Sequence, residues 1–244
     1  MCRHLCYLGP PATLASVVLD PPHSLLVQSY APTDMRGAGS VNADGFGVGW
    51  HTEAGVVHYR RSVPIWQDRG FAQLAATTRS TAVLASVRNA TVGMPISDAA
   101  NAPFVGDGWM FSLNGRIDGW PASAVKLAES LDIEDLLTLD APTDAALLWA
   151  VVRSRLRLGR PPGDVLHEVI TETLAAAADS RLNLLLTDGD TAWGSTVTHA
   201  LWARLDPAIL ASEPFDDDSA WQEIPGQSLV RLDRDALSIE PLNG

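Results

Sequence analysis

The sequence predicts an α+β fold with mainly antiparallel sheets. Strand patterns joined by short turns occur towards both ends of the chain, two helical patterns lie together between them, and no strand–helix–strand alternation is present. The 244 residues, 46% of them hydrophobic, are enough for one large core or two small ones. Because no long Ser/Gly/Pro-rich or charged linker divides the chain, we expect a single domain over residues 1–244.

The first half of the chain contains mainly strand patterns. Residues 3–8 form a mixed apolar run that ends at Gly9-Pro10-Pro11, which predicts an N-terminal strand followed by a turn. Glycines alternate with apolar residues over residues 45–49, which indicates that another backbone or a ligand approaches this strand closely. The other elements expected in this half are helices over residues 12–19 and 68–78 and strands over residues 24–29, 41–50, 56–60, 83–88 and 109–113.

The second half begins with helices and ends with strands. Residues 145–156 and 166–177 carry apolar side chains at helical spacing, and Pro161-Pro162-Gly163 separates the two patterns. Two such helices in succession would cover one face of a sheet. Asp188-Gly189 is a strong hairpin signal between two strand patterns. The strands expected in this half cover residues 183–187, 191–196 and 229–232.

The charge of the chain limits its partners. The formal net charge of −12 gives a field that repels phosphate backbones and anionic headgroups, so we expect neither a nucleic acid nor a membrane as partner. No apolar run approaches the roughly 18 to 20 residues of a spanning helix, and Gly9-Pro10-Pro11 interrupts any signal-peptide pattern. We therefore expect a cytoplasmic protein. The sequence leaves the oligomeric state open and allows a homo-oligomer.

The two cysteines, Cys2 and Cys6, are too few for a disulfide framework. If residues 3–8 form a strand, Cys2 and Cys6 are about 13 Å apart, which excludes a disulfide between them. Together with His4 they would lie in a line on one face, which does not surround a tetrahedral metal ion. We expect no metal, and because no dinucleotide or phosphate-binding motif is present, no organic cofactor.

Cys2 combines a nucleophile with a base if Met1 is removed. The exposed residue would carry a thiol, with an ordinary pKa of about 8.5, and a free α-amine, with an ordinary pKa of about 8. The amine could accept the thiol proton at neutral pH. The alternative is an ordinary, partly buried cysteine, and the residue alone leaves both interpretations open.

Five segments, taken in order, resemble those of class II glutamine amidotransferases of the N-terminal-nucleophile superfamily. They are Met1-Cys2-Arg3-His4, residues 42–50, Val87-Arg88-Asn89-Ala90-Thr91, residues 111–115 and Pro142-Thr143-Asp144. The resemblance implies a four-layer αββα sandwich with two mainly antiparallel sheets. It also implies hydrolysis of a γ-glutamyl amide in a small-molecule substrate, through a thioester on an N-terminal cysteine.

A narrower resemblance concerns the branch of this family that hydrolyses γ-glutamyl-hercynylcysteine sulfoxide in ergothioneine biosynthesis. It lies in residues 1–8, His23-Ser24-Leu25-Leu26, Pro64-Ile65-Trp66 and residues 114–120. Two other functions stay open: a glutaminase subunit that delivers ammonia to a separate synthetase, and a catalytically silent γ-glutamyl-binding protein.

The resemblance assigns a role to each of five residues. Cys2 would be the nucleophile and its α-amine the base. Arg88 would bind the glutamyl α-carboxylate through its planar guanidinium, and Asp144 would accept from the α-ammonium. The Asn114 side-chain amide and the Gly115 backbone N–H would form the oxyanion hole.

Each recognition residue also has an ordinary structural interpretation. Arg88 could form a surface ion pair, Asn114-Gly115 is a common hairpin turn, and Asp144 suits the positive end of a helix. The family often carries histidine where this chain has Leu113, which affects substrate positioning and not the chemistry.

A leaving group that bears a trimethylammonium would need aromatic rings for recognition. Trp66, Trp109 and Trp120 are the candidates, and each could equally be a core or rim aromatic residue.

Overall fold

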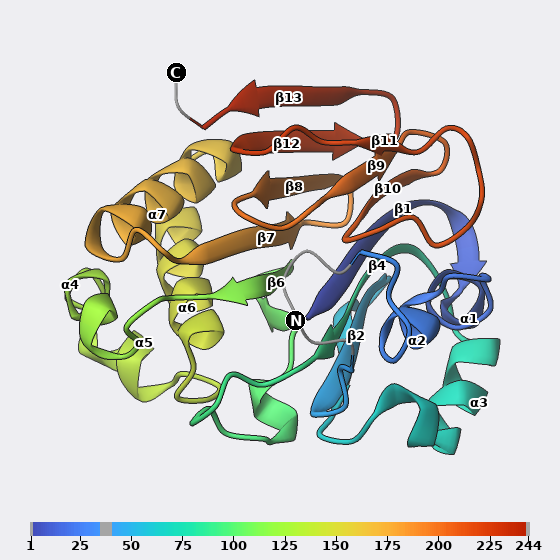
Figure 1. Cartoon of the computed structure of the whole chain (residues 1–244), viewed down its shortest axis with the longest axis horizontal. Coiled ribbons are helices and arrows are strands. Elements are labelled where there is room, and N and C mark those ends of the chain that lie inside the picture. The colour runs from blue at the N-terminus through green and yellow to red at the C-terminus, as the bar shows by residue number, and fades with distance from the viewer. Residues whose placement is uncertain (1, 35–40, 243–244) are drawn as a thin grey trace.

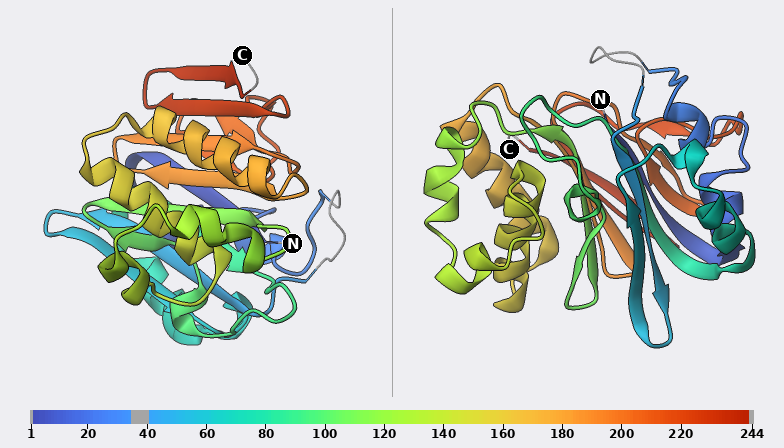
Figure 2. Two further views of the ribbon diagram at one scale, coloured as in Figure 1. Left: turned by 90° about the vertical axis from the view of Figure 1, so that its left-hand side faces the viewer. Right: turned by 90° about the horizontal axis from the view of Figure 1, so that it is seen from below.

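The computed structural model describes residues 2–34 and 41–242, which form two stacked antiparallel sheets with helices on both outer faces (Figures 1 and 2). The first sheet contains, in spatial order, β11 (Gln222–Glu223), β9 (Trp202–Arg204), β10 (Ala208–Ala211), β1 (Arg3–Thr13), β4 (Arg79–Arg88), β2 (Gly45–Thr52) and β3 (Gly55–Arg61). The second contains β13 (Leu237–Pro241), β12 (Ser228–Asp233), β8 (Thr191–Thr196), β7 (Arg181–Thr187), β6 (Trp109–Arg116) and β5 (Phe104–Gly106).

The helices form the two outer layers. The first sheet is covered by α1 (Leu14–Val18), α2 (Leu25–Gln28) and α3 (Arg69–Thr77), and the second by α4 (Val125–Ala128), α5 (Ile133–Leu137), α6 (Asp144–Arg157) and α7 (Pro162–Ala176). Short 3-10 turns occur at Ile65–Gln67, Asp98–Ala100 and Ala122–Ala124. Within the part of the chain that the structure describes, no helix is long and apolar enough to cross a bilayer.

Buried apolar side chains lie in three layers because the central strands are covered on both faces. In β4, Val83 packs towards α1 and α3, whereas the next residue, Leu84, packs between the two sheets against Met110 and Leu185. The third layer joins the second sheet to α6 and α7, with Leu148 and other fully buried residues. Strands buried on both faces have nearly continuous apolar sequences, as residues 83–87 do.

Several predicted elements are confirmed, and the structure shows the residue at which each begins. Asp68 caps α3, its Oδ1 accepting from the Phe71 N–H at 2.9 Å. Thr143 caps α6, its hydroxyl accepting from the Ala146 N–H at 3.2 Å, and α7 begins at Pro162. The hairpin at Asp188-Gly189 is also present, between β7 and β8.

Two predictions of local structure are wrong, and one structural alternative is excluded. Residues 24–29 do not form a strand: Ser24 caps the short helix α2, and its hydroxyl accepts from the Val27 N–H at 3.4 Å. The N-terminal strand does not end at Gly9, because β1 continues to Thr13 after a shift of register between Leu8 and Ala12. Asn114-Gly115 is not a turn. Both residues lie inside β6, paired with Asn183 and Leu182 of β7.

The alternating glycines of β2 accommodate another segment of backbone. A Cβ added at Gly47 would lie 2.2 Å from the carbonyl oxygen of Ala102, and that oxygen also accepts from the Ser86 hydroxyl at 2.6 Å. The expected close approach is therefore made by the chain itself, which packs the segment before β5 against the first sheet.

We expect Gly47→Ala to destabilise the fold by about 1–3 kcal/mol, because the methyl group has no room unless backbone moves. Chemical denaturation would measure the change. Gly163→Ala is the matched control, since its Cβ would meet only Leu229 at 3.8 Å and Trp193 at 4.0 Å, and its stability should be unchanged or slightly raised. Equal stability of the Gly47→Ala and wild-type proteins would show that the close approach is not rigid.

Candidate active site

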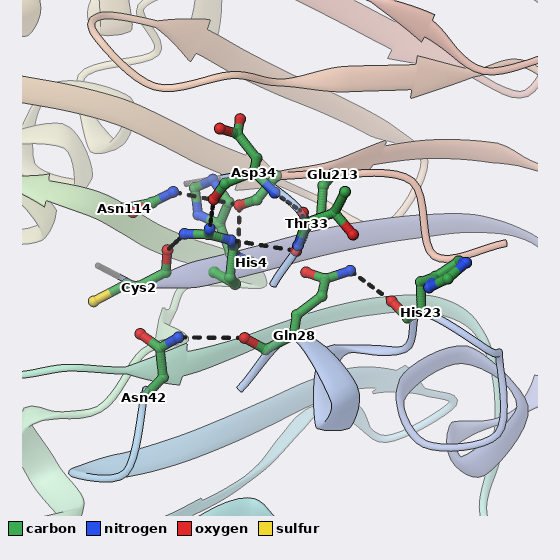
Figure 3. A network of polar contacts seen from close by, with 11 residues as sticks. Cys2, His4, His23, Gln28, Thr33, Asp34, Asn42, Asn114 and Glu213 are labelled. Carbon is green, nitrogen blue, oxygen red and sulfur yellow. Dashed lines mark hydrogen bonds and ion pairs between the residues drawn. The ribbon is translucent and has the colours of Figure 1, made fainter. Parts of the chain in front are cut away.

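Cys2 is placed by the start of β1, a central strand of the first sheet. Arg3 pairs with Val87 of β4, so Cys2 lies beside the residues at which β4 ends. Its Sγ is 3.7 Å from the carbonyl oxygen of Asn89, the distance of a weak S–H···O contact. The side chain is half-buried, and Figure 3 shows it directed away from Glu213.

Two adjoining hollows meet at Cys2. The first hollow is lined by Cys2, Ser86, Arg88, Met94, Gly115 and Asp144, among others. The second hollow is lined by Cys2, Asn89, Asn114, Gly115, Arg181 and His199, among others. The structure thus brings together the five residues for which the sequence predicts catalytic or recognition roles, with Cys2 and Gly115 common to both hollows.

Arg88 brings a positive charge to the first hollow. It is the last residue of β4, and its Nη1 donates to the carbonyl oxygen of Pro95 at 2.8 Å. Among the described residues, the Arg88 guanidinium forms no ion pair, so the surface ion-pair interpretation does not apply there. A guanidinium held by a neutral carbonyl keeps donors for an anionic ligand.

Asp144 brings a negative charge to the same hollow. It is the first residue of α6 and is buried, with Oδ2 accepting from the Ile117 N–H at 2.9 Å and Oδ1 from the Ala145 N–H at 2.8 Å. Burial raises the pKa of Asp144, and the two backbone N–H groups and the Arg88 charge oppose that rise. The carboxylate is therefore fixed in position and faces a cation of the protein across the hollow.

Asn114 is fully buried in β6 and is held by a serine that sequence reasoning did not identify. Its Nδ2 donates to the Ser212 hydroxyl at 3.3 Å, and the same hydroxyl accepts from the His4 backbone N–H at 3.0 Å. An amide carries two N–H groups, so one remains for a ligand. Figure 3 shows Asn114 and Cys2 on the same side of His4.

A buried ion pair holds the backbone of Cys2. Arg3 is 2% exposed; its Nε lies 3.5 Å from Oε1 of Glu213, and its Nη1 donates to the Cys2 carbonyl oxygen at 3.1 Å. Glu213 also accepts from the backbone N–H groups of Thr33 and Asp34, at 2.9 and 2.7 Å, and Arg3 donates to the Asp34 carbonyl (Figure 3). The only sequence signal for this network is an arginine at the start of the mixed apolar run over residues 3–8.

The two histidines near Cys2 are neutral at physiological pH. Burial, followed by the His199 and Arg3 charges, lowers the pKa of His4 to about 3, and its Nδ1 lies 3.1 Å from the Ser112 hydroxyl. Burial, followed by the charges of Arg181 and Arg3, lowers the pKa of His199 to about 4. Neither imidazole can therefore supply a positive charge to the site.

The three tryptophans are not brought together. Trp120 lines a third hollow, which borders the first because both contain Thr91, Met94 and Asp144. Trp109 packs against Trp193 with ring centroids 5.7 Å apart, at the end of β6 about 20 Å from Gly115 at 3.3 Å per residue. Trp66 meets Tyr30 edge to face at 5.9 Å. Neither Trp66 nor Trp109 is among the residues that line these three hollows, and contact of these tryptophans with the leaving group stays a prediction.

Comparison with protein sequences identifies relatives over the full length of the chain. The family model for class II glutamine amidotransferases matches residues 13–207. The chain is 41% identical to the gamma-glutamyl-hercynylcysteine sulfoxide hydrolase of Mycolicibacterium smegmatis, with 99% of this chain and 100% of the relative aligned. It is 38% identical to a protein of the same name from Mycobacterium tuberculosis, with 100% and 97% aligned.

Solved structures show the same fold. A structure described as a glutamine aminotransferase class-II domain protein from Silicibacter pomeroyi superposes with a TM-score of 0.73 at 20% identity, over the full length of both chains. The glutamine phosphoribosylpyrophosphate amidotransferase of B. subtilis superposes with a TM-score of 0.62 at 11% identity, over all of this chain and 49% of that one. The predicted αββα sandwich with two antiparallel sheets is confirmed, and the chain belongs to the class II glutamine amidotransferases.

Proposed function

We propose that this protein hydrolyses the γ-glutamyl amide of γ-glutamyl-hercynylcysteine sulfoxide, releasing glutamate and hercynylcysteine sulfoxide in ergothioneine biosynthesis. The observation that carries the proposal is the first hollow, where one cation, one anion and a thiol face a common space. The full-length similarity to two hydrolases of that name supports this substrate over others. Residues 1–244 would act as one glutamine amidotransferase domain.

Arg88 and Asp144 would bind the amino-acid end of the glutamyl group. A γ-glutamyl tail carries an α-carboxylate and an α-ammonium on one carbon, so it needs a cation and an anion at one end of its pocket. The Arg88 guanidinium and the Asp144 carboxylate provide that pair, and the fixed geometry of Asp144 reduces the ordering cost of binding.

Cys2 would be the nucleophile after removal of Met1, a residue that lies outside those described. The α-amine of Cys2 takes the thiol proton, and the thiolate attacks the γ-carbonyl carbon. The C–N bond breaks as that proton passes to the leaving amine, and a γ-glutamyl thioester remains on Cys2. Water then hydrolyses the thioester, which releases glutamate and restores the thiol.

Asn114 and Gly115 would stabilise the oxyanion that forms in both halves of the reaction. The Asn114 amide is held by Ser212 and therefore needs little reorganisation, the condition under which such donors contribute most. Gly115 has a separate structural requirement, since a Cβ there would lie 1.9 Å from the Arg181 carbonyl oxygen.

The test is to incubate purified protein separately with γ-glutamyl-hercynylcysteine sulfoxide and with glutamine, and to follow both products by mass spectrometry. We expect glutamate and hercynylcysteine sulfoxide, with glutamine hydrolysed at least about tenfold more slowly because it lacks the contacts of the larger leaving group. N-terminal sequencing should give Cys2 as the first residue.

Other outcomes would favour the alternatives. Preferential release of ammonia from glutamine, increased by a partner protein, would indicate a glutaminase subunit. Binding of the conjugate without turnover, in a chain that begins at Met1, would indicate a silent binding protein.

A further inference from the structure

The second hollow lies where the leaving amine of a bound substrate would be. It shares Cys2 and Gly115 with the first hollow but contains neither Arg88 nor Asp144. If the glutamyl tail occupies the first hollow and its carbonyl carbon meets Cys2, the atoms beyond the amide nitrogen enter the second. The third hollow, lined by Trp120, is not lined by Cys2.

Two arginines face each other across neighbouring strands at the edge of the second hollow. Arg116, the last residue of β6, pairs in register with Arg181, the first residue of β7, and both line the hollow. Like charges directly opposite in an antiparallel pair are destabilising. The second hollow therefore concentrates positive charge in a chain whose net charge is −12.

The protein neutralises little of this charge. Arg116 Nη2 lies 3.3 Å from Oδ1 of the half-exposed Asp118, but the buried Nε of Arg116 has no hydrogen-bond partner among the described residues. Arg181 has no ion pair within the same part of the chain. The carboxylate of Asp34 acts on His199 from nearby, but Asp34 does not line the hollow.

His199 adds a neutral polar group to the same space. It is 6% exposed, it lines the second hollow, and its buried Nδ1 has no hydrogen-bond partner among the described residues. A neutral imidazole can donate one hydrogen bond to an anion. Two incompletely paired guanidiniums and an unpartnered imidazole nitrogen are the donors that a carboxylate needs.

We infer that Arg181, assisted by Arg116, binds a carboxylate on the leaving amine, so that the enzyme selects γ-glutamyl α-amino acids over glutamine and simple γ-glutamyl amines. The inference rests on the proposed function. In a γ-glutamyl α-amino acid, the carboxylate carbon is about 2.5 Å from the scissile nitrogen, so it stays next to Cys2. The cysteinyl part of hercynylcysteine sulfoxide carries such a carboxylate.

The experiment compares two substrates that differ only in this carboxylate, γ-glutamyl-S-methylcysteine and γ-glutamyl-S-methylcysteamine. We expect wild-type enzyme to prefer the first in kcat/KM by about 10- to 100-fold, the range of a charge-assisted hydrogen bond. Arg181→Met should abolish most of this preference. Its kcat/KM should fall by about 10- to 100-fold for the carboxylated substrate and by less than about threefold for the other. Arg181→Lys should retain part of the preference, since it keeps the charge and loses the planar fork.

Two further measurements separate recognition from damage to the fold. Because Arg181 faces Arg116, Arg181→Met should leave the thermal midpoint unchanged or raised. Arg231→Met, on β12 and remote from the hollows, should change kcat/KM for neither substrate.

Equal hydrolysis of both substrates by the wild-type enzyme, or an equal loss on both in Arg181→Met, would overturn this inference and leave the proposed function standing. Failure of wild-type enzyme to hydrolyse any γ-glutamyl compound would overturn both.

Discussion

Cys2→Ala is expected to fold normally and to lose hydrolysis of the γ-glutamyl conjugate, with kcat reduced by about 10⁴-fold or more. Alanine keeps the N-terminal amine but has no sulfur, so no thioester can form. The fold should tolerate the change because, within residues 2–34 and 41–242, the one hydrogen-bond contact of the half-buried side chain is the weak one from Sγ to the Asn89 carbonyl oxygen, at 3.7 Å. Steady-state kinetics with mass-spectrometric detection of glutamate would measure the loss, and circular dichroism would verify the fold.

Cys6 provides the matched control for this variant. It is buried between the sheets, and burial raises the pKa of its thiol to about 12, so it carries no thiolate at neutral pH. Iodoacetamide should therefore alkylate Cys2 alone and inactivate the enzyme, whereas Cys6→Ala should keep its activity and lose some stability. Residual activity above about 1% in Cys2→Ala would contradict a nucleophilic role for Cys2.

The elements that the sequence predicted well are those with strong local signals. Helix α6 is fourteen residues long, carries apolar side chains at helical spacing and begins after a capping threonine. The β7–β8 hairpin has Asp188-Gly189 at its turn. The strand prediction over residues 24–29 was wrong because a four-residue helix is too short for its apolar periodicity to be distinguished from that of a strand. Its serine cap was the better indicator.

The short strands β9, β10 and β11 were not predicted because they are defined by pairing and not by local pattern. Ala208–Ala211 is four residues long, and it pairs with β1, which lies some two hundred positions earlier in the chain. Only the completed first sheet gives this segment its role. Ser212, which accepts from the Asn114 side chain, and Glu213, which pairs with Arg3, follow β10 directly.

The residues of the site also divide into those with a local sequence signal and those that only the fold brings into place. Cys2, Arg88 and Asp144 lie in recognisable motifs, and their positions in space could be anticipated from a family resemblance. Arg181 and His199 lie in ordinary sequence. Arg181 reaches the second hollow because β7 pairs with β6. His199 follows β8, and Asn183 of β7 holds it there, with Oδ1 accepting from the His199 N–H at 3.1 Å. The predicted role of the tryptophans stays a prediction, because large aromatic side chains pack in protein cores as well as against ligands.

Arg88→Ala is expected to reduce kcat/KM for the γ-glutamyl conjugate by about 10²- to 10³-fold, the effect of removing one partner of a partly buried charge pair. The guanidinium has no ion pair among the described residues and is held by the Pro95 carbonyl oxygen at 2.8 Å, so its other donors remain for the substrate α-carboxylate. Its loss should also raise the pKa of Asp144 further, because the Arg88 charge now lowers it. Steady-state kinetics on the same conjugate would measure the effect.

Substrate analogues locate the missing contact. A 4-aminobutanoyl amide lacks the α-carboxylate and should be hydrolysed equally slowly by wild type and Arg88→Ala, whereas a glutaryl amide lacks only the ammonium and should still show the full difference. Arg79→Ala is the matched control at the opposite end of β4, where the exposed side chain donates to the Pro11 carbonyl oxygen at 3.3 Å, and its kinetics should equal those of wild type. If Arg88→Ala slowed hydrolysis of the γ-glutamyl conjugate and of both analogues by the same factor, the arginine would support the shape of the hollow and would not bind the carboxylate. The glutamyl group would then need a different cation for its recognition.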